Sequence, residues 1–256
     1  MKFYLVFICL PLFSISFAQK SIKVTYEQKI IYSDTFFNQL PESDREEFRT
    51  ILSAPTYFEL TNNGDGSLFK SVNLKKEVIA SKEMNTATSR NMGTIFKPFK
   101  VRVLKDFINQ VIIKSAEVED KEYYLEEPFS KEELHFDEKI KTIDSYTCKS
   151  AYTLTAANDT IQYWYTQEIP VIDGPFNMQE IPGLILSVES KKKVIYATKI
   201  EFFDKKLQLE TVPVNASFIT DKELNKMKLE ALKPTSYTDE SGMKHETYSI
   251  HIKADK

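Results

Sequence analysis

Two acidic residues in a proline-rich segment are the side chains whose types and spacing could best support catalysis. Glu168 and Asp173 lie five residues apart, between the aromatic stretch 163–165 and an apolar run that begins at Leu184. Two carboxylates that flank one bond are the basic requirement for glycoside hydrolysis. Nothing in the spacing selects this pair from the 37 acidic residues of the chain. A carboxylate-dependent hydrolase is therefore the alternative interpretation, and a non-enzymatic function is the leading one.

Other kinds of catalytic or metal site find less support. Segment 164–186 contains no histidine, lysine or serine, so it lacks a nucleophile beside a base. His245 and His251 would stand roughly 20 Å apart on one strand, too far to share a metal ion. His135 lies in a generic polar cluster, and neither a glycine-rich phosphate loop nor a Cys-x-x-Cys pair is present. The sequence therefore predicts no catalytic residue, no metal ligand and no cofactor.

The segment with the two carboxylates resembles a family signature. Its most specific positions are Trp164, Tyr165, Thr166, Glu168, Pro170, Gly174, Pro175, Pro182, Gly183, Leu184 and Ile185. Together with an Ile-x-x-Tyr-x-Cys-x-x-Ala block at 143–151, this stretch is similar to the GLPGLI family of secreted Bacteroidetes proteins. Glu180 and Ile181 replace the first Gly-Leu of that string. The resemblance implies an exported protein without an established activity, and it makes these positions a candidate ligand-binding signature.

Backbone geometry offers a structural explanation of the same segment. Pro182 and Gly183 suit the two central positions of a type II turn from Ile181 to Leu184, because proline presets φ and glycine accepts positive φ. Segment 167–183 then forms a long connection between two strands. Trp164, the only tryptophan of the chain, should face away from its tyrosine neighbours as a core anchor or as the wall of a ligand pocket.

The N-terminus has the features of a cleaved leader. Lys2 precedes an apolar run from Phe3 to Phe13, and residues 16–18 form a small-x-small cleavage site. We expect residues 1–18 to be a signal peptide and residues 19–256 to be one domain. The leader contains Cys9, so cleavage would leave Cys148 unpaired, and we expect Cys148 to be a buried strand residue.

Composition limits the partners. The net charge is −3 and the charges are interspersed, which argues against nucleic acid and anionic membrane surfaces. After cleavage no apolar run is long enough to span a membrane. We therefore expect a periplasmic, secreted or outer-membrane-associated protein that is not membrane-spanning.

Period-two patterns predict a mainly β (α+β) protein with one large curved antiparallel sheet and a few short helices. A capping box at Thr220 and Glu223 predicts a C-terminal helix over which the sheet could close. A further helix should follow Ser43, and residues 76–98 read as a loop. The predicted strands are 22–32, 57–60, 68–72, 100–114, 121–125, 139–143, 146–155, 160–166, 184–189, 194–203 and 245–253.

These observations favour a non-enzymatic exported protein that binds an apolar ligand or an envelope protein on a curved sheet. A structural interaction module of the envelope and the carboxylate-dependent hydrolase are the alternatives. An apolar cavity beneath the sheet would support ligand binding. Two carboxylates that converge in a polar cleft would support the hydrolase.

The leader generates the first testable prediction. The exported protein should begin at Gln19 and carry no lipid, because the small residues end at Ala18 and Cys9 lies inside the apolar run. N-terminal sequencing and intact mass of the exported protein would check this. A chain that still begins at Met1, or an acylated cysteine, would contradict it.

Overall fold

The computed structural model describes residues 21–38, 42, 45–72, 78–82, 92–96, 100–131, 133–178, 180–231, 235–238 and 244–247. The predicted signal peptide with its cleavage site, the predicted helix cap at Ser43, and His251 lie outside the described residues.

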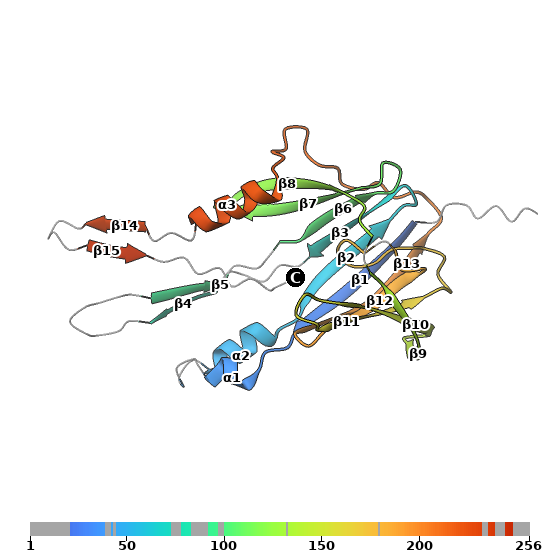
Figure 1. The fold of residues 1–256 in the computed structure, drawn as a ribbon, viewed down its shortest axis with the longest axis horizontal. Helices are drawn as coiled ribbons and strands as arrows, with labels where there is room; N and C mark the ends of the chain where they lie inside the picture. Colours follow the sequence, from blue (N-terminus) through green and yellow to red (C-terminus); the bar gives the residue numbers. More distant parts are fainter. Residues whose placement is uncertain are drawn as a thin grey trace, which may run out of the picture.

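One open antiparallel sheet of 11 strands forms most of the molecule (Figure 1). Its strand order is β8-β7-β6-β3-β2-β1-β13-β12-β11-β10-β9. The strands are β1 (Ser21–Ile30), β2 (Thr56–Asn62), β3 (Gly66–Val72), β6 (Arg102–Asp106), β7 (Val111–Val118), β8 (Lys121–Pro128), β9 (His135–Ile143), β10 (Tyr146–Leu154), β11 (Thr160–Thr166), β12 (Leu184–Glu189) and β13 (Lys193–Phe203).

Three helices and two small hairpins complete the described structure. Helices α1 (Asp34–Asn38) and α2 (Arg45–Ser53) connect β1 to β2, and α3 (Asp221–Ala231) follows the last strand of the large sheet. The hairpins are β4 (Val78–Lys82) with β5 (Met92–Phe96), and β14 (Thr235–Thr238) with β15 (Lys244–Thr247). In Figure 1 both hairpins extend beyond the same end of the large sheet.

The predicted fold class is confirmed, with two corrections to its elements. The predicted strand 100–114 is a hairpin, because the Asp106 carboxylate accepts hydrogen bonds from the backbone of Ile108 and Asn109 and turns the chain there. The predicted loop 76–98 contains β4 and β5. The capping box is present: Glu223 accepts a hydrogen bond from the Thr220 backbone, and Thr220 Oγ1 accepts one from the Glu223 backbone.

The sheet does not close over α3. Among the described residues, the helix packs on the last two strands of one end, where Leu224 joins a small cluster with Val118 and Leu125. We call the side of the sheet that carries this cluster the core face. The same face bears the main hydrophobic core, which includes Val24 and Phe69, both with no exposed surface.

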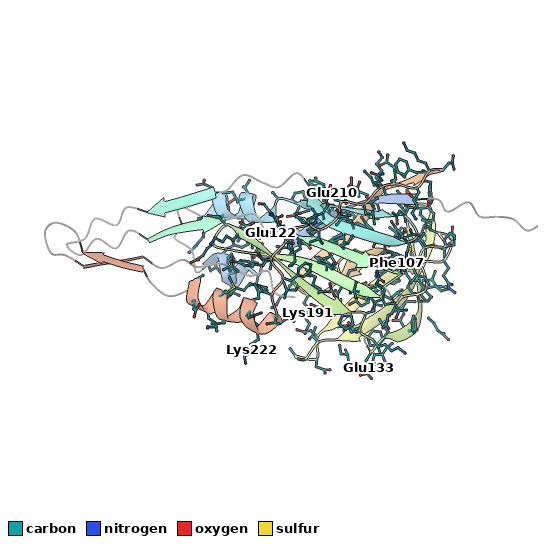
Figure 2. All side chains as sticks on the ribbon, turned by 90° about the horizontal axis from the view of Figure 1, so that it is seen from above. Phe107, Glu122, Glu133, Lys191, Glu210 and Lys222 are labelled. Atoms are coloured by element: carbon teal, nitrogen blue, oxygen red, sulfur yellow. The ribbon has the colours of Figure 1, made fainter. Side chains whose placement is uncertain are left out.

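The opposite side, here called the outer face, is covered over only part of its width. Segment 204–219 crosses it at β3, β6 and β8, where Glu210 pairs with Lys70 and with Arg102, at 3.0 Å from the latter. Further along, Phe218 packs on Tyr124 with ring centroids 6.0 Å apart. Glu210 and Lys222 of α3 accordingly lie on opposite sides of the molecule (Figure 2).

Cys148 is a buried strand residue, as predicted. It has no exposed surface, and burial raises the pKa of its thiol above the ordinary value. Both effects suppress the thiolate, which is the nucleophilic form.

Cys148 should therefore resist thiol reagents in the native state and react only after unfolding. A Cys148→Ser variant should lose about 1–3 kcal/mol of unfolding free energy, because a hydroxyl replaces a thiol in an apolar site. Labelling followed by mass spectrometry measures the first effect and urea titration the second. The control is Ser145→Cys in the exposed β9–β10 turn, which should label at once; equally rapid native labelling of Cys148 would contradict the prediction.

Candidate functional site

The connection between β11 and β12, residues 167–183, packs on the core face of the sheet. Phe176 lies against the rings of Phe58 and Phe69, with centroids 6.0 and 5.0 Å away. Met178 and Ile181 belong to the same core cluster. The connection thus fills the space beneath the sheet in which sequence analysis placed an apolar ligand.

A buried ion pair holds this connection to the sheet. Lys105 Nζ, from β6, lies 2.6 Å from Asp173 Oδ1, and both side chains have no exposed surface. The remaining Lys105 donors reach the carbonyl oxygens of Gly174, at 2.8 Å, and Met178, at 2.9 Å. Asn62 Nδ2 of β2 donates to Asp173 Oδ2 over 2.7 Å.

Burial and charge around this pair change the pKa values of its neighbours and of Lys105 itself. Burial lowers the pKa of the Lys105 ammonium, and the adjacent Asp173 carboxylate opposes that shift. Tyr26 has its pKa raised well above the ordinary value, first by burial and then by the negative charge of Asp173. Its hydroxyl donates to the Ile185 carbonyl oxygen at 2.7 Å. A buried charge is tolerated only when it is paired and hydrogen-bonded, and these contacts meet that condition.

The proposed carboxylate pair does not form. Asp173 is buried against Lys105, whereas Glu168 is exposed and accepts a hydrogen bond from the Thr147 backbone at 2.8 Å. The two residues therefore perform separate structural tasks and cannot flank one substrate bond. The five-residue spacing gave no sign of this, because the partner of Asp173 lies 68 positions earlier in the chain.

Gly183 confirms the predicted positive φ but not the predicted turn. Its φ is 151°, and its N–H donates to the Ile181 carbonyl oxygen, which makes a three-residue turn around Pro182 in place of a type II turn. A Cβ at Gly183 would lie 2.2 Å from the Thr166 carbonyl oxygen of β11. Glycine is thus required because the connection passes directly against a strand backbone.

The other signature positions are mostly part of the packing. Leu184 and Leu186 are buried as predicted, and Trp164 is 9% exposed. Gly174 lies against Ile185, and Ile185 donates its backbone N–H to the Asp173 carbonyl oxygen at 2.9 Å. The buried members are Tyr165, Thr166, Gly174, Pro175, Gly183, Leu184 and Ile185; Pro182 is half-buried and Pro170 is exposed.

Trp164 points to the outer face, as the strand alternation predicts. It is paired across the sheet with Ser150 and Ser187. The Lys141 ammonium lies 4.2 Å from the centroid of the indole ring and 2.5 Å from Glu189 Oε1. Ser187 Oγ donates to the same carboxylate oxygen. Burial alone would raise the pKa of Glu189, but its contacts with Lys141, Trp164 and Ser187 lower it overall.

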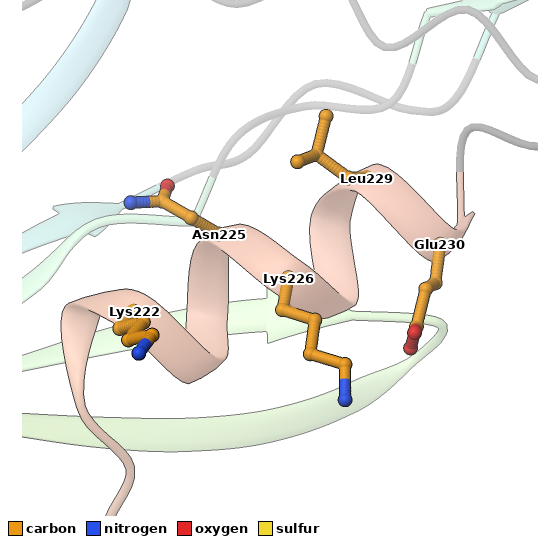
Figure 3. Close-up of a pocket in the computed structure, with 5 residues that line it drawn as sticks. All are labelled: Lys222, Asn225, Lys226, Leu229 and Glu230. Atoms are coloured by element: carbon orange, nitrogen blue, oxygen red, sulfur yellow. The ribbon is translucent and has the colours of Figure 1, made fainter.

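Two other kinds of site can be placed. The surface of α3 carries an open depression lined by Lys222, Asn225, Lys226, Leu229 and Glu230, away from the sheet core (Figure 3).

Within the described ranges, no group of three or more His, Cys, Asp and Glu side chains is arranged to hold a metal ion. His135 stacks on Tyr152 with centroids 5.0 Å apart. No helix in the described part of the chain is long and apolar enough to cross a membrane.

A family model for the N-terminal domain of the N-glycanase peptide matches residues 61–226, which is more than half of the chain. The chain belongs to this family. Two solved structures of PNGF-II share its fold, one in space group P21 with a TM-score of 0.55 and one in C2 with a TM-score of 0.53. Each is 15% identical and aligns with 86% of this chain but only 35% of its own. No curated protein sequence matches the chain.

Membership of this family corrects two predictions. The assignment to the GLPGLI family is wrong, because the matching family is that of the N-glycanase N-terminal domain. The shared Pro-Gly-Leu-Ile string is explained by packing, since a chain that passes close to a strand carbonyl needs glycine before it enters the next strand. The non-enzymatic interpretation is also wrong, because the family is named for an enzyme.

The buried ion pair between Lys105 and Asp173 generates a testable prediction. Asp173→Asn should lower the unfolding free energy by about 3–5 kcal/mol, because it leaves the Lys105 ammonium buried without a counter-charge. Chemical denaturation with circular dichroism measures the change. Glu210→Gln, which removes one partner of a partly exposed ion pair, should cost less than about 1 kcal/mol. Equal losses of unfolding free energy in the two variants would contradict the prediction, because the buried pair would then contribute no more than the partly exposed one.

Proposed function

We propose that the chain acts on N-glycoproteins as a domain of an N-glycan-hydrolysing enzyme. The single observation that carries this proposal is the family match over residues 61–226, which includes both members of the buried ion pair and every strand from β3 to β13. The shared fold of PNGF-II supports it. Because the chain spans about a third of the length of those structures, the proposal concerns one part of such an activity.

The leader-like residues 1–18 support export. We propose that the chain meets its glycoprotein substrates outside the cytoplasm. This proposal is closer to the carboxylate-dependent hydrolase, which the sequence suggested as an alternative, than to a non-enzymatic binding protein. Glu168 and Asp173 are not, however, the carboxylates that such a hydrolase would use.

The test compares one N-glycosylated protein with the same protein after its N-glycans have been removed. We expect the purified chain to bind the glycosylated form more tightly in biolayer interferometry, because the glycan supplies contacts that the bare protein lacks. Mass spectrometry of the same mixtures would show whether the chain also releases glycans. Equal affinity for the two forms, without glycan release, would contradict the proposal.

A further inference from the structure

A row of side chains in direct register crosses the outer face beside segment 204–219, and three of its members, Trp164, Ser187 and Ser150, are buried. Seven adjacent strands each contribute one residue in direct register with the next. Residues that are paired in this way point to the same side of a sheet. We call this set the outer row; its members, in spatial order from β2 to β9, are Tyr57, Glu27, Tyr196, Ser187, Trp164, Ser150 and Asp137.

Aromatic residues occupy every second strand in one half of the outer row. Tyr57, Tyr196 and Trp164 alternate with Glu27 and Ser187. Neighbouring strands lie about 4.8 Å apart, so successive aromatic residues are separated by about 9–10 Å. This separation is comparable to the length of two linked sugar units. Tyr57 and Tyr196 are half-buried, so each keeps part of its ring surface accessible.

Three carboxylate–lysine pairs make the row and its borders electrically balanced. Glu27 lies 3.1 Å from Lys29, Asp137 lies 2.9 Å from Lys139, and Glu189 pairs with Lys141 above Trp164. Tyr196 donates its hydroxyl to Glu27 at 2.7 Å. Such a surface presents many hydrogen-bond donors and acceptors without a net charge. Its chemistry matches a neutral ligand rich in hydroxyl groups better than an anion or a cation.

The indole of Trp164 lies below the exposed part of the row. It is more than nine-tenths buried, and its Nε1 lies beside Glu189 with almost no exposed surface. The Lys141 ammonium lies over the ring and pairs with Glu189, and both of these side chains are partly exposed. A ligand over this part of the row therefore meets the Lys141–Glu189 pair and not the indole N–H.

The backbone is also irregular where the row crosses the sheet. The pairing register shifts between Lys149 and Ser150 and between Trp164 and Tyr165, so two row residues border a bulge. Bulges bend a strand and redirect side chains, and they are frequent beside binding sites.

We propose that the outer row, with Lys141 and Glu189 at its border, binds a neutral oligosaccharide chain of an N-glycoprotein. Sugar hydroxyls bridge the carboxylate–lysine pairs, while the apolar faces of sugar rings rest on the partly exposed tyrosine rings. The inference rests on the proposed function for the identity of the ligand, and on the row itself for its position and neutral character.

The only tryptophan of the chain provides a local probe of this site. Titration of the full chain with a free neutral high-mannose N-glycan should shift the Trp164 emission in a saturable way. A sialylated N-glycan should bind no more tightly, because the row offers no excess positive charge. Glycerol at the same hydroxyl concentration serves as the solvent control. Tighter binding of the sialylated glycan would overturn the neutral-ligand assignment.

One variant tests the residues, with calorimetry as a second readout. Glu189→Gln should weaken glycan binding by about tenfold, since it removes a hydrogen bond to a charged group. Glu210→Gln makes the same carboxylate-to-amide change on the covered half of the outer face and should leave affinity unchanged. Circular dichroism of each variant confirms that it is folded, and the partly exposed Glu189 makes at least that variant compatible with folding.

The outcomes separate this inference from the proposed function. If the chain prefers the glycosylated protein while Glu189→Gln binds glycan like wild type and the Trp164 emission is unchanged, the outer row is not the site and the proposed function stands. If neither free glycan nor glycoprotein binds, both proposals are overturned. Saturable Trp164 quenching that weakens in Glu189→Gln but not in Glu210→Gln would support the row.

Discussion

The buried contact between Lys105 and Asp173 is the constraint on which the arrangement of the sheet depends. It joins β6, near one end of the sheet, to the connection between β11 and β12 near the other end. The Lys105 ammonium also holds two carbonyl oxygens of that connection, and Asn62 holds the carboxylate from β2. Residues 167–183 are thereby kept over the core face, where Phe176 completes the aromatic packing. An apolar pair of similar volume could stabilise the fold equally well but would specify this alignment less strictly.

The two faces of the sheet consequently have different roles. The connection 167–183 and α3 fill the core face, while segment 204–219 contacts the opposite side from Ser21 of β1 to Tyr124 of β8. On strands β2 to β9 this face carries the outer row, in which Tyr57, Glu27 and Tyr196 are partly exposed. Trp164, Ser187 and Ser150 of the same row are buried. A wide sheet with one face reserved for packing and half of the other left open suits the binding of an extended chain. The filled core face argues against a carrier that encloses an apolar molecule there.

Local patterns in the sequence predicted the elements well, whereas contacts between distant segments were not predictable. The alternation of Tyr163, Trp164 and Tyr165 placed the indole on the correct face, and the Thr220–Glu223 capping box located the start of α3. The hairpin after Asp106 was missed because it contains neither glycine nor proline. The role of Asp173 was missed because its partner belongs to a strand that only the folded sheet brings near. The outer row depends on six strand registers, and none of these can be read from one strand alone.

The central position of β1 has a consequence for how the protein reaches this state. Ser21 pairs with Phe203, so the first described strand is completed on one side by the last strand of the large sheet. Until residues 193–203 are available, β1 can pair only with β2 and presents an unsatisfied edge. Strands that are so far apart in sequence pair slowly, because the chain between them loses conformational entropy before the pairing contributes any stability. Segment 21–62 therefore remains exposed to unwanted association until residues 193–203 have been synthesised.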